Sequence, residues 1–121
     1  MKRDIQDRAF RFACAVVSLH RAVVQKDATS RTLGMQLLRS GTSIGANLEE
    51  ACAGQSRADF VSKCTIALKE ARETHYWLKL LEATAVPSSD EARPLLKEAD
   101  ELIAILTTIV RKTKGNGEFR I

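Results

Sequence analysis

Residues 39–51 read Arg-Ser-Gly-Thr-Ser-Ile-Gly-Ala-Asn-Leu-Glu-Glu-Ala, and the interpretation of the whole chain starts from this stretch. It lies inside a helical pattern, in which Ile44 and Leu48 fall on one face. Yet it contains Gly41 and Gly45, each of which costs about 1 kcal/mol relative to alanine inside a helix. The two glycines are four residues apart and share a face. We therefore expect another backbone to approach that face, either from a helix of the same subunit or from a second subunit or a ligand.

Length and composition predict a single globular domain over residues 1–121, with 45% hydrophobic and 28% charged residues. Uncharged runs such as residues 14–20 are much too short to span a bilayer. We do not expect the first four residues, Met-Lys-Arg-Asp, to start a signal peptide, because no continuous apolar segment follows them. We expect a cytoplasmic protein without a membrane partner.

The three cysteines, Cys14, Cys52 and Cys64, are an odd number and lack the spacing of metal ligands. Each falls in a helical pattern, which favours small buried thiols in a reducing compartment.

Hydrophobic periodicity predicts four helices and no strands, and therefore an all-α fold. Thr29 or Ser30 would cap the second helix, Gly54 would end it in a left-handed conformation, and Ser56 would cap the third. The short connection around Ser56 makes the second and third helices antiparallel neighbours. The expected helices cover residues 4–26, 30–53, 57–85 and 89–114.

The last helix has more apolar residues than one buried stripe requires, which indicates a second buried face and an oligomer. Tyr76 and Trp77 in the third helix suit either an interface or a position at the edge of the core. Asn47 and Glu50 could line a groove, or could satisfy each other or a neighbouring helix.

The net charge is +4, and the basic residues are concentrated near the two ends of the chain. Such a charge is compatible with a polyanionic partner such as RNA, although a basic helix edge can also be an ordinary solvated face. The candidate nucleic-acid contacts are Arg8, Arg11, Arg39, Arg57, Lys63, Arg111 and Lys112.

No catalytic or cofactor-binding motif is present in the sequence. A di-iron bundle needs Glu three residues before a His, but Val17 precedes His20 and Arg72 precedes His75 at that spacing. Cys64 lies about three helical turns from His75, too far for a nucleophile and its base within one helix. We expect neither metal nor cofactor, and no enzymatic activity.

Four blocks, residues 38–51, 56–60, 67–74 and 76–78, resemble the four-helix-bundle family whose founding members are encoded in intervening sequences of bacterial 23S ribosomal RNA genes. The accessory variability determinant of diversity-generating retroelements looks like a relative. The Ser-Ile-Gly-Ala-Asn block is the most specific part of the resemblance. The motif residues are Ser40, Gly41, Ser43, Ile44, Gly45, Ala46, Asn47, Glu50, Asp59, Phe60, Glu70 and Trp77.

The resemblance implies an antiparallel up-down-up-down four-helix bundle that assembles as a homopentamer with a central channel. Retroelement relatives bind nucleic acid and a reverse transcriptase. Our leading expectation is a non-enzymatic oligomer that binds RNA or a ribonucleoprotein through basic residues. The alternatives are a protein-interaction scaffold, for example an accessory subunit of a reverse transcriptase, and a small-molecule pocket between helices.

Overall fold

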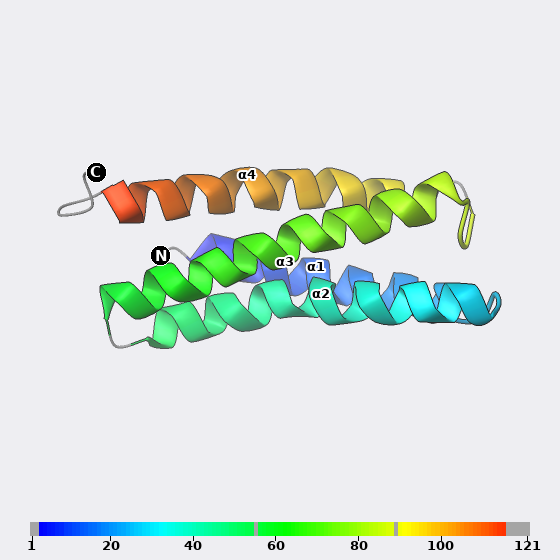
Figure 1. Cartoon of the computed structure of the whole chain (residues 1–121), viewed down its shortest axis with the longest axis horizontal. Coiled ribbons are helices and arrows are strands. Elements are labelled where there is room, and N and C mark those ends of the chain that lie inside the picture. The colour runs from blue at the N-terminus through cyan, green and yellow to red at the C-terminus, as the bar shows by residue number, and fades with distance from the viewer. Residues whose placement is uncertain (1–2, 55, 89, 116–121) are drawn as a thin grey trace.

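A computed structural model describes residues 3–54, 56–88 and 90–115 of the chain. Successive helices run antiparallel and lie side by side, so the predicted all-α up-down-up-down bundle is confirmed (Figure 1). The four helices are α1 (Arg3–Val23), α2 (Ala28–Ala53), α3 (Arg57–Ala83) and α4 (Arg93–Gly115).

Side chains that cap the helices set where α2 and α3 begin. The predicted cap of α2, Thr29 or Ser30, is wrong, because the carboxylate of Asp27 accepts a hydrogen bond from the Ser30 N–H at 2.7 Å. This bond also lowers the pKa of Asp27. The prediction for α3 is confirmed, since the Ser56 hydroxyl accepts from the Asp59 N–H at 3.1 Å.

Several helix ends differ from the sequence prediction. The helix α1 stops at Val23 rather than at residue 26. Gly54 is extended, with φ of −67°, so its predicted left-handed conformation is wrong. The left-handed residue is Ala85, with φ of 57°, after which the Val86 N–H donates to the Leu81 carbonyl at 2.9 Å and closes the end of α3. The helix α4 begins at Arg93, later than the expected residue 89, which lies outside the described residues.

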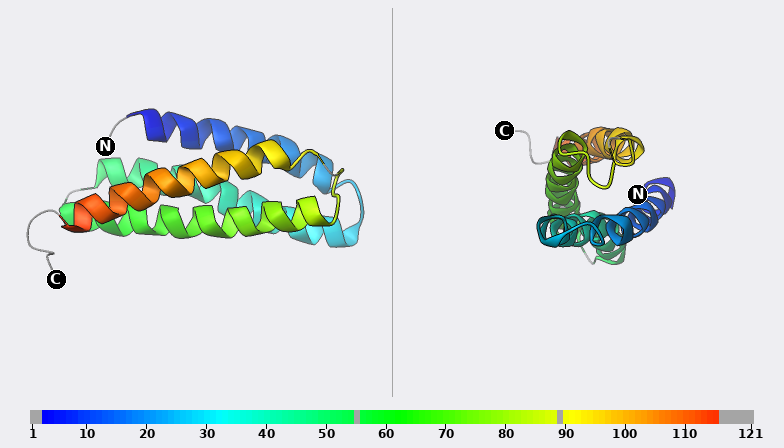
Figure 2. Two further views of the ribbon diagram at one scale, coloured as in Figure 1. Left: turned by 90° about the horizontal axis from the view of Figure 1, so that it is seen from above. Right: turned by 90° about the vertical axis from the view of Figure 1, so that its right-hand side faces the viewer.

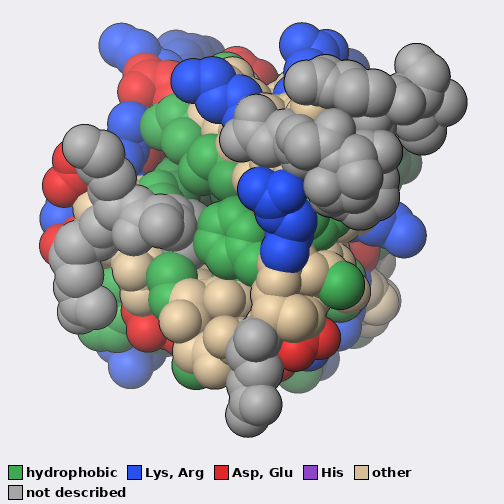
Figure 3. All heavy atoms as spheres, turned by 90° about the vertical axis from the view of Figure 1, so that its left-hand side faces the viewer, with side chains coloured by type: hydrophobic (Ala, Val, Ile, Leu, Met, Phe, Trp, Pro, Cys, Tyr) green, Lys and Arg blue, Asp and Glu red, His purple; other side chains and the backbone are tan. Residues whose placement is uncertain are grey.

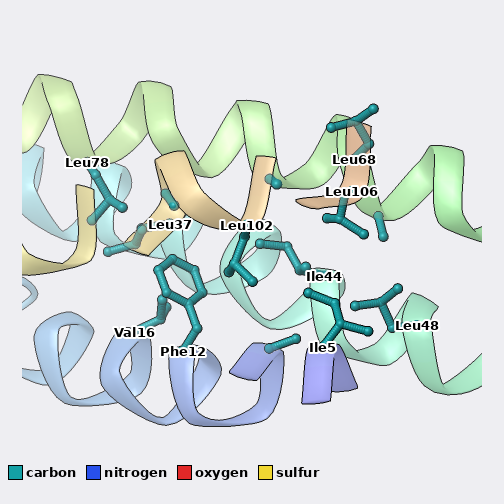
Figure 4. Packing of buried hydrophobic residues seen from close by; sticks show 14 of the residues in the cluster. Ile5, Phe12, Val16, Leu37, Ile44, Leu48, Leu68, Leu78, Leu102 and Leu106 are labelled. Atoms are coloured by element: carbon teal, nitrogen blue, oxygen red, sulfur yellow. The ribbon is translucent and has the colours of Figure 1, made fainter. Parts of the chain in front are cut away.

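The core is formed by one apolar face from each helix (Figure 4). Cys64 belongs to it, and burial raises the pKa of its thiol to about 11. Cys14 and Cys52 are exposed, so the prediction of three buried thiols is wrong for two of them. Cys14 lies on the outer side of α1 and Cys52 in the last turn of α2, beyond the core. The labelled core residues are Ile5, Phe12, Val16, Leu37, Ile44, Leu48, Leu68, Leu78, Leu102 and Leu106.

The two glycines of α2 face α1 of the same chain, as one of the two alternatives predicts. A Cβ atom on Gly41 would lie 2.8 Å from both methyl carbons of Val16, closer than real contacts allow. A Cβ atom on Gly45 would lie 3.6 Å from Ala9, at ordinary van der Waals distance. Only Gly41 therefore requires the absence of a side chain.

Candidate functional site

Positive charge is concentrated at the end of the bundle where α1 and α3 begin and α2 and α4 finish. Eight Lys or Arg and five Asp or Glu occur at this end, in residues 3–12, 46–54, 56–64 and 106–115. The other described residues contain nine of each kind, so they contribute no net charge. Viewed from this end, Lys and Arg side chains lie around a hydrophobic area (Figure 3).

Four of the seven predicted nucleic-acid contacts are exposed at this end: Arg11, Arg57, Arg111 and Lys112. Arg11 from α1 and Lys112 from α4 line the same groove, although about a hundred residues separate them in sequence. Lys114 is also exposed here and was not among the predicted contacts, although it belongs to the same basic segment of sequence.

Arg8 is a structural ion-pair residue. Its guanidinium donates to the Glu98 carboxylate at 2.9 and 2.7 Å and to Glu101 at 2.7 Å. These bonds raise the pKa of Arg8 further above its already high value, chiefly through Glu98. Two carboxylates engage its Nε and Nη2 donors and offset its charge, so the geometry assigns Arg8 to joining α1 and α4.

The Arg39 guanidinium is also bonded to carboxylates, and Arg39 lies midway along α2 rather than at the basic end. It donates to Glu70 at 3.3 Å and to Glu73, both on α3. The indole N–H of Trp77 donates to the same Glu73 carboxylate at 3.0 Å, and the Arg39 and Trp77 bonds lower the pKa of Glu73. Trp77 is half-buried while Tyr76 is 57% exposed, so only Trp77 fits the core-edge alternative.

The Lys63 ammonium lies 2.7 Å from the Glu50 carboxylate, which raises the pKa of Lys63. Glu50 therefore pairs with a neighbouring helix, as one alternative predicts. Asn47 does not bond to Glu50; its side-chain N–H donates to the Ser43 carbonyl of the same helix at 2.9 Å. The suggestion that these two residues satisfy each other is wrong.

The motif stretch mainly holds the bundle together. Ser40 is fully buried, and its hydroxyl oxygen lies 2.9 Å from that of Thr74 on α3. Ile44 is in the core, Gly41 contacts α1, and Ala46 is exposed. Ser40, Gly41 and Ile44, in the first half of the stretch, thus lie away from the basic end.

A groove of about 750 Å³ opens between the start of α1 and the last turns of α4. These two helices contact each other least of the neighbouring pairs, and in the view from above they diverge towards the start of α1 and the end of α4 (Figure 2). The groove contains half-buried apolar side chains that the sequence predicted as surplus on the last helix. Its apolar lining consists of Ile5, Phe60, Ile105 and Ile109, and its charged lining of Asp4, Asp7, Arg8, Arg11 and Lys112.

Within residues 3–54, 56–88 and 90–115, no three His, Cys, Asp or Glu side chains are arranged to hold a metal ion. The Nε2 atom of His75 lies 2.9 Å from a carboxylate oxygen of Asp100, and the ring of His20 lies 2.9 Å from the Gly34 carbonyl. Both histidines thus connect helices. Among the described helices, none combines the length and the apolar character needed to cross a membrane.

These features define an antiparallel four-helix bundle with a basic end and an apolar groove. The chain belongs to the family of 23S rRNA-intervening sequence proteins, which matches over residues 1–108. It is similar to a protein of unknown function of the S23 ribosomal protein family from Bacteroides thetaiotaomicron, whose crystal structure is known. The identity is 41%, over 88% of this chain and 98% of the other, with a TM-score of 0.81. No curated protein matches the chain significantly.

Proposed function

We propose that this protein binds RNA without catalysing a reaction, and that the basic end of the bundle is the contact surface. The observation that carries the proposal is the segregation of charge, because the surplus of positive charge among the described residues lies at one end. Phosphates attract such a surface at long range and independently of sequence. Assembly into a homopentamer, which the family resemblance implies, would repeat the surface in one particle.

The proposal assigns different roles to the seven basic residues that the sequence suggested. Arg11, Arg57, Arg111 and Lys112 serve as contacts, and Lys114 joins them. Since Arg8, Arg39 and Lys63 are bonded to carboxylates, their role is to hold neighbouring helices together.

The direct test is RNA binding by a variant that carries Arg11→Gln, Arg111→Gln and Lys112→Gln. Fluorescence anisotropy with a labelled RNA hairpin at low salt should show that the affinity of this variant is lower by a factor of about ten or more. The slope of log affinity against log salt should fall by roughly three, one for each lost phosphate contact.

The matched control carries Arg21→Gln, Lys26→Gln and Arg31→Gln, three exposed residues near the opposite end. It loses the same charge and should bind RNA nearly as well as the original protein. Equal losses in both variants would show that overall charge, rather than the basic end, determines binding.

A second candidate function, a protein-interaction scaffold, is favoured by the groove between α1 and α4. Its apolar lining and its volume of about 750 Å³ suit one face of an amphipathic helix. Ile109→Asn would place a polar but uncharged side chain among Ile5 and Phe60, and it should weaken binding of a protein partner while leaving the charge of the basic end, and hence RNA binding, unchanged. The two functions thus respond to different substitutions.

A further inference from the structure

A second pocket lies at the basic end, on the side where α2 turns into α3. It has a volume of about 490 Å³ and is lined by three helices. Gln6 comes from α1, Cys52 from the last turn of α2, and Ser56 and Arg57 from the start of α3. Phe60 lines both this pocket and the apolar groove, so the two cavities are adjacent.

Gln6 is the unusual residue of this pocket. It is only 7% exposed, yet among the described residues its side-chain amide has no hydrogen-bond partner. No fully enclosed side-chain nitrogen or oxygen in the described chain lacks a partner, so the Gln6 amide must reach the open space of the pocket. The amide therefore has donor and acceptor capacity that a molecule entering the pocket can use.

The start of α3 adds favourable electrostatics for an anion. The first backbone N–H groups of a helix have no acceptor within the helix, and the helix dipole makes this end positive. Ser56 uses its hydroxyl for the Asp59 N–H and its carbonyl for the Phe60 N–H. The Ala58 N–H lies before these two groups in the first turn of α3, where an N–H has no acceptor within the helix. The Arg57 side chain contributes a guanidinium, whose planar donors suit phosphate oxygens.

From these three contributions we propose that the pocket is a binding site for a phosphate group. The Gln6 amide donates one hydrogen bond, the first turn of α3 donates another, and the Arg57 guanidinium supplies charge. The inference rests on the proposed function only for the source of the phosphate, which is the RNA backbone; free inorganic phosphate would make the same contacts. Asp59, in the same first turn, opposes binding through its negative charge.

Titration of the ¹⁵N-labelled full chain with inorganic phosphate tests the site. Saturable NMR shifts are expected at the backbone N–H of Ala58 and at the side-chain NH₂ of Gln6. Gln6→Met keeps the side-chain length but removes the amide, and it should weaken phosphate binding about five-fold, as the loss of one hydrogen bond implies. Gln36→Met, at an exposed glutamine of α2, is the control and should leave the affinity unchanged.

Two further variants extend the test. Arg57→Gln, at an exposed position, should weaken phosphate binding about ten-fold, because a charge-assisted contact is lost. Asp59→Asn should strengthen phosphate binding by relieving repulsion. Gln6→Met should also melt at the same or a higher temperature than the original protein in phosphate-free buffer, which separates a ligand-binding role from a structural one.

Absence of saturable shifts, or equal affinities for Gln6→Met and Gln36→Met, would overturn the phosphate site. If RNA binding then still depends on Arg11, Arg111 and Lys112, the proposed function survives that failure. Competition identifies the source: the RNA hairpin should displace inorganic phosphate, whereas unchanged phosphate shifts in its presence would assign the site to the free ion.

Discussion

Replacing Gly41 and Gly45 by alanine, one at a time, should have opposite effects on stability. Either substitution gains about 1 kcal/mol, because alanine favours the helix. At Gly41 the new Cβ would lie 2.8 Å from two methyl carbons of Val16, and overpacking of this kind costs about 1–3 kcal/mol. At Gly45 the nearest atoms belong to Ala9 at 3.6 Å, so nothing must move. Gly45→Ala should raise the free energy of unfolding by up to about 1 kcal/mol, and Gly41→Ala should lower it by about 0–2 kcal/mol.

The measurement is urea unfolding followed by circular dichroism, at several protein concentrations so that any contribution from assembly is visible. Val16→Ala provides the key comparison, since it removes the two methyl groups that the new Cβ would meet. In that background only the Cβ of residue 16 stays close, at 3.2 Å, so Gly41→Ala should be neutral or stabilising, which a double-mutant cycle detects as a coupling energy of about 1–3 kcal/mol. Equal effects of the two glycine substitutions, or zero coupling with Val16, would refute the packing argument.

Two further contacts and one backbone conformation give predictions in which the direction of the change in stability is known. Because the folded-state pKa of Glu73 is lowered, its contact with Arg39 stabilises the protein above the unfolded pKa near 4.3, and that contribution disappears as the pH falls through the folded pKa. Arg39→Gln should therefore lower the melting temperature at pH 7 but not at a pH below both values. Thr74→Val should lower the free energy of unfolding by about 1 kcal/mol in urea unfolding. Combining it with Ser40→Ala should cost less than the sum of the two single changes, because the double variant leaves no hydroxyl without its partner. Ala85→Gly should raise the melting temperature slightly, since relief of the left-handed conformation, worth about 1–2 kcal/mol, exceeds the added freedom of the unfolded chain.

The fold could be predicted from the sequence because its signals are local. Apolar residues at helix spacing identified all four helices, and the small residues of α2 indicated a close helix contact. The helix ends were harder to predict from the sequence, because Asp27, Thr29 and Ser30 are all residues that can cap a helix. The end of α3 depends on Ala85, a residue whose identity gives no sign of a left-handed conformation.

The candidate site could be predicted only in part, because side-chain pairing across helices is not a local property. Arg8 and Arg11 look alike in the sequence, yet only Arg8 faces Glu98 on a helix ninety residues away. Gln6 was missed altogether, since a glutamine near the start of a helix is normally exposed. Its significance follows from burial at a junction of three helices, which requires the tertiary structure.

The salt dependence of RNA binding by the unmodified protein tests the central claim most directly. If the basic end contacts RNA phosphates, affinity for the labelled hairpin should fall steeply and linearly as log affinity against log salt, with a slope of about −3 to −5. A slope near zero, or no binding even at the lowest salt concentration, would contradict the proposed function.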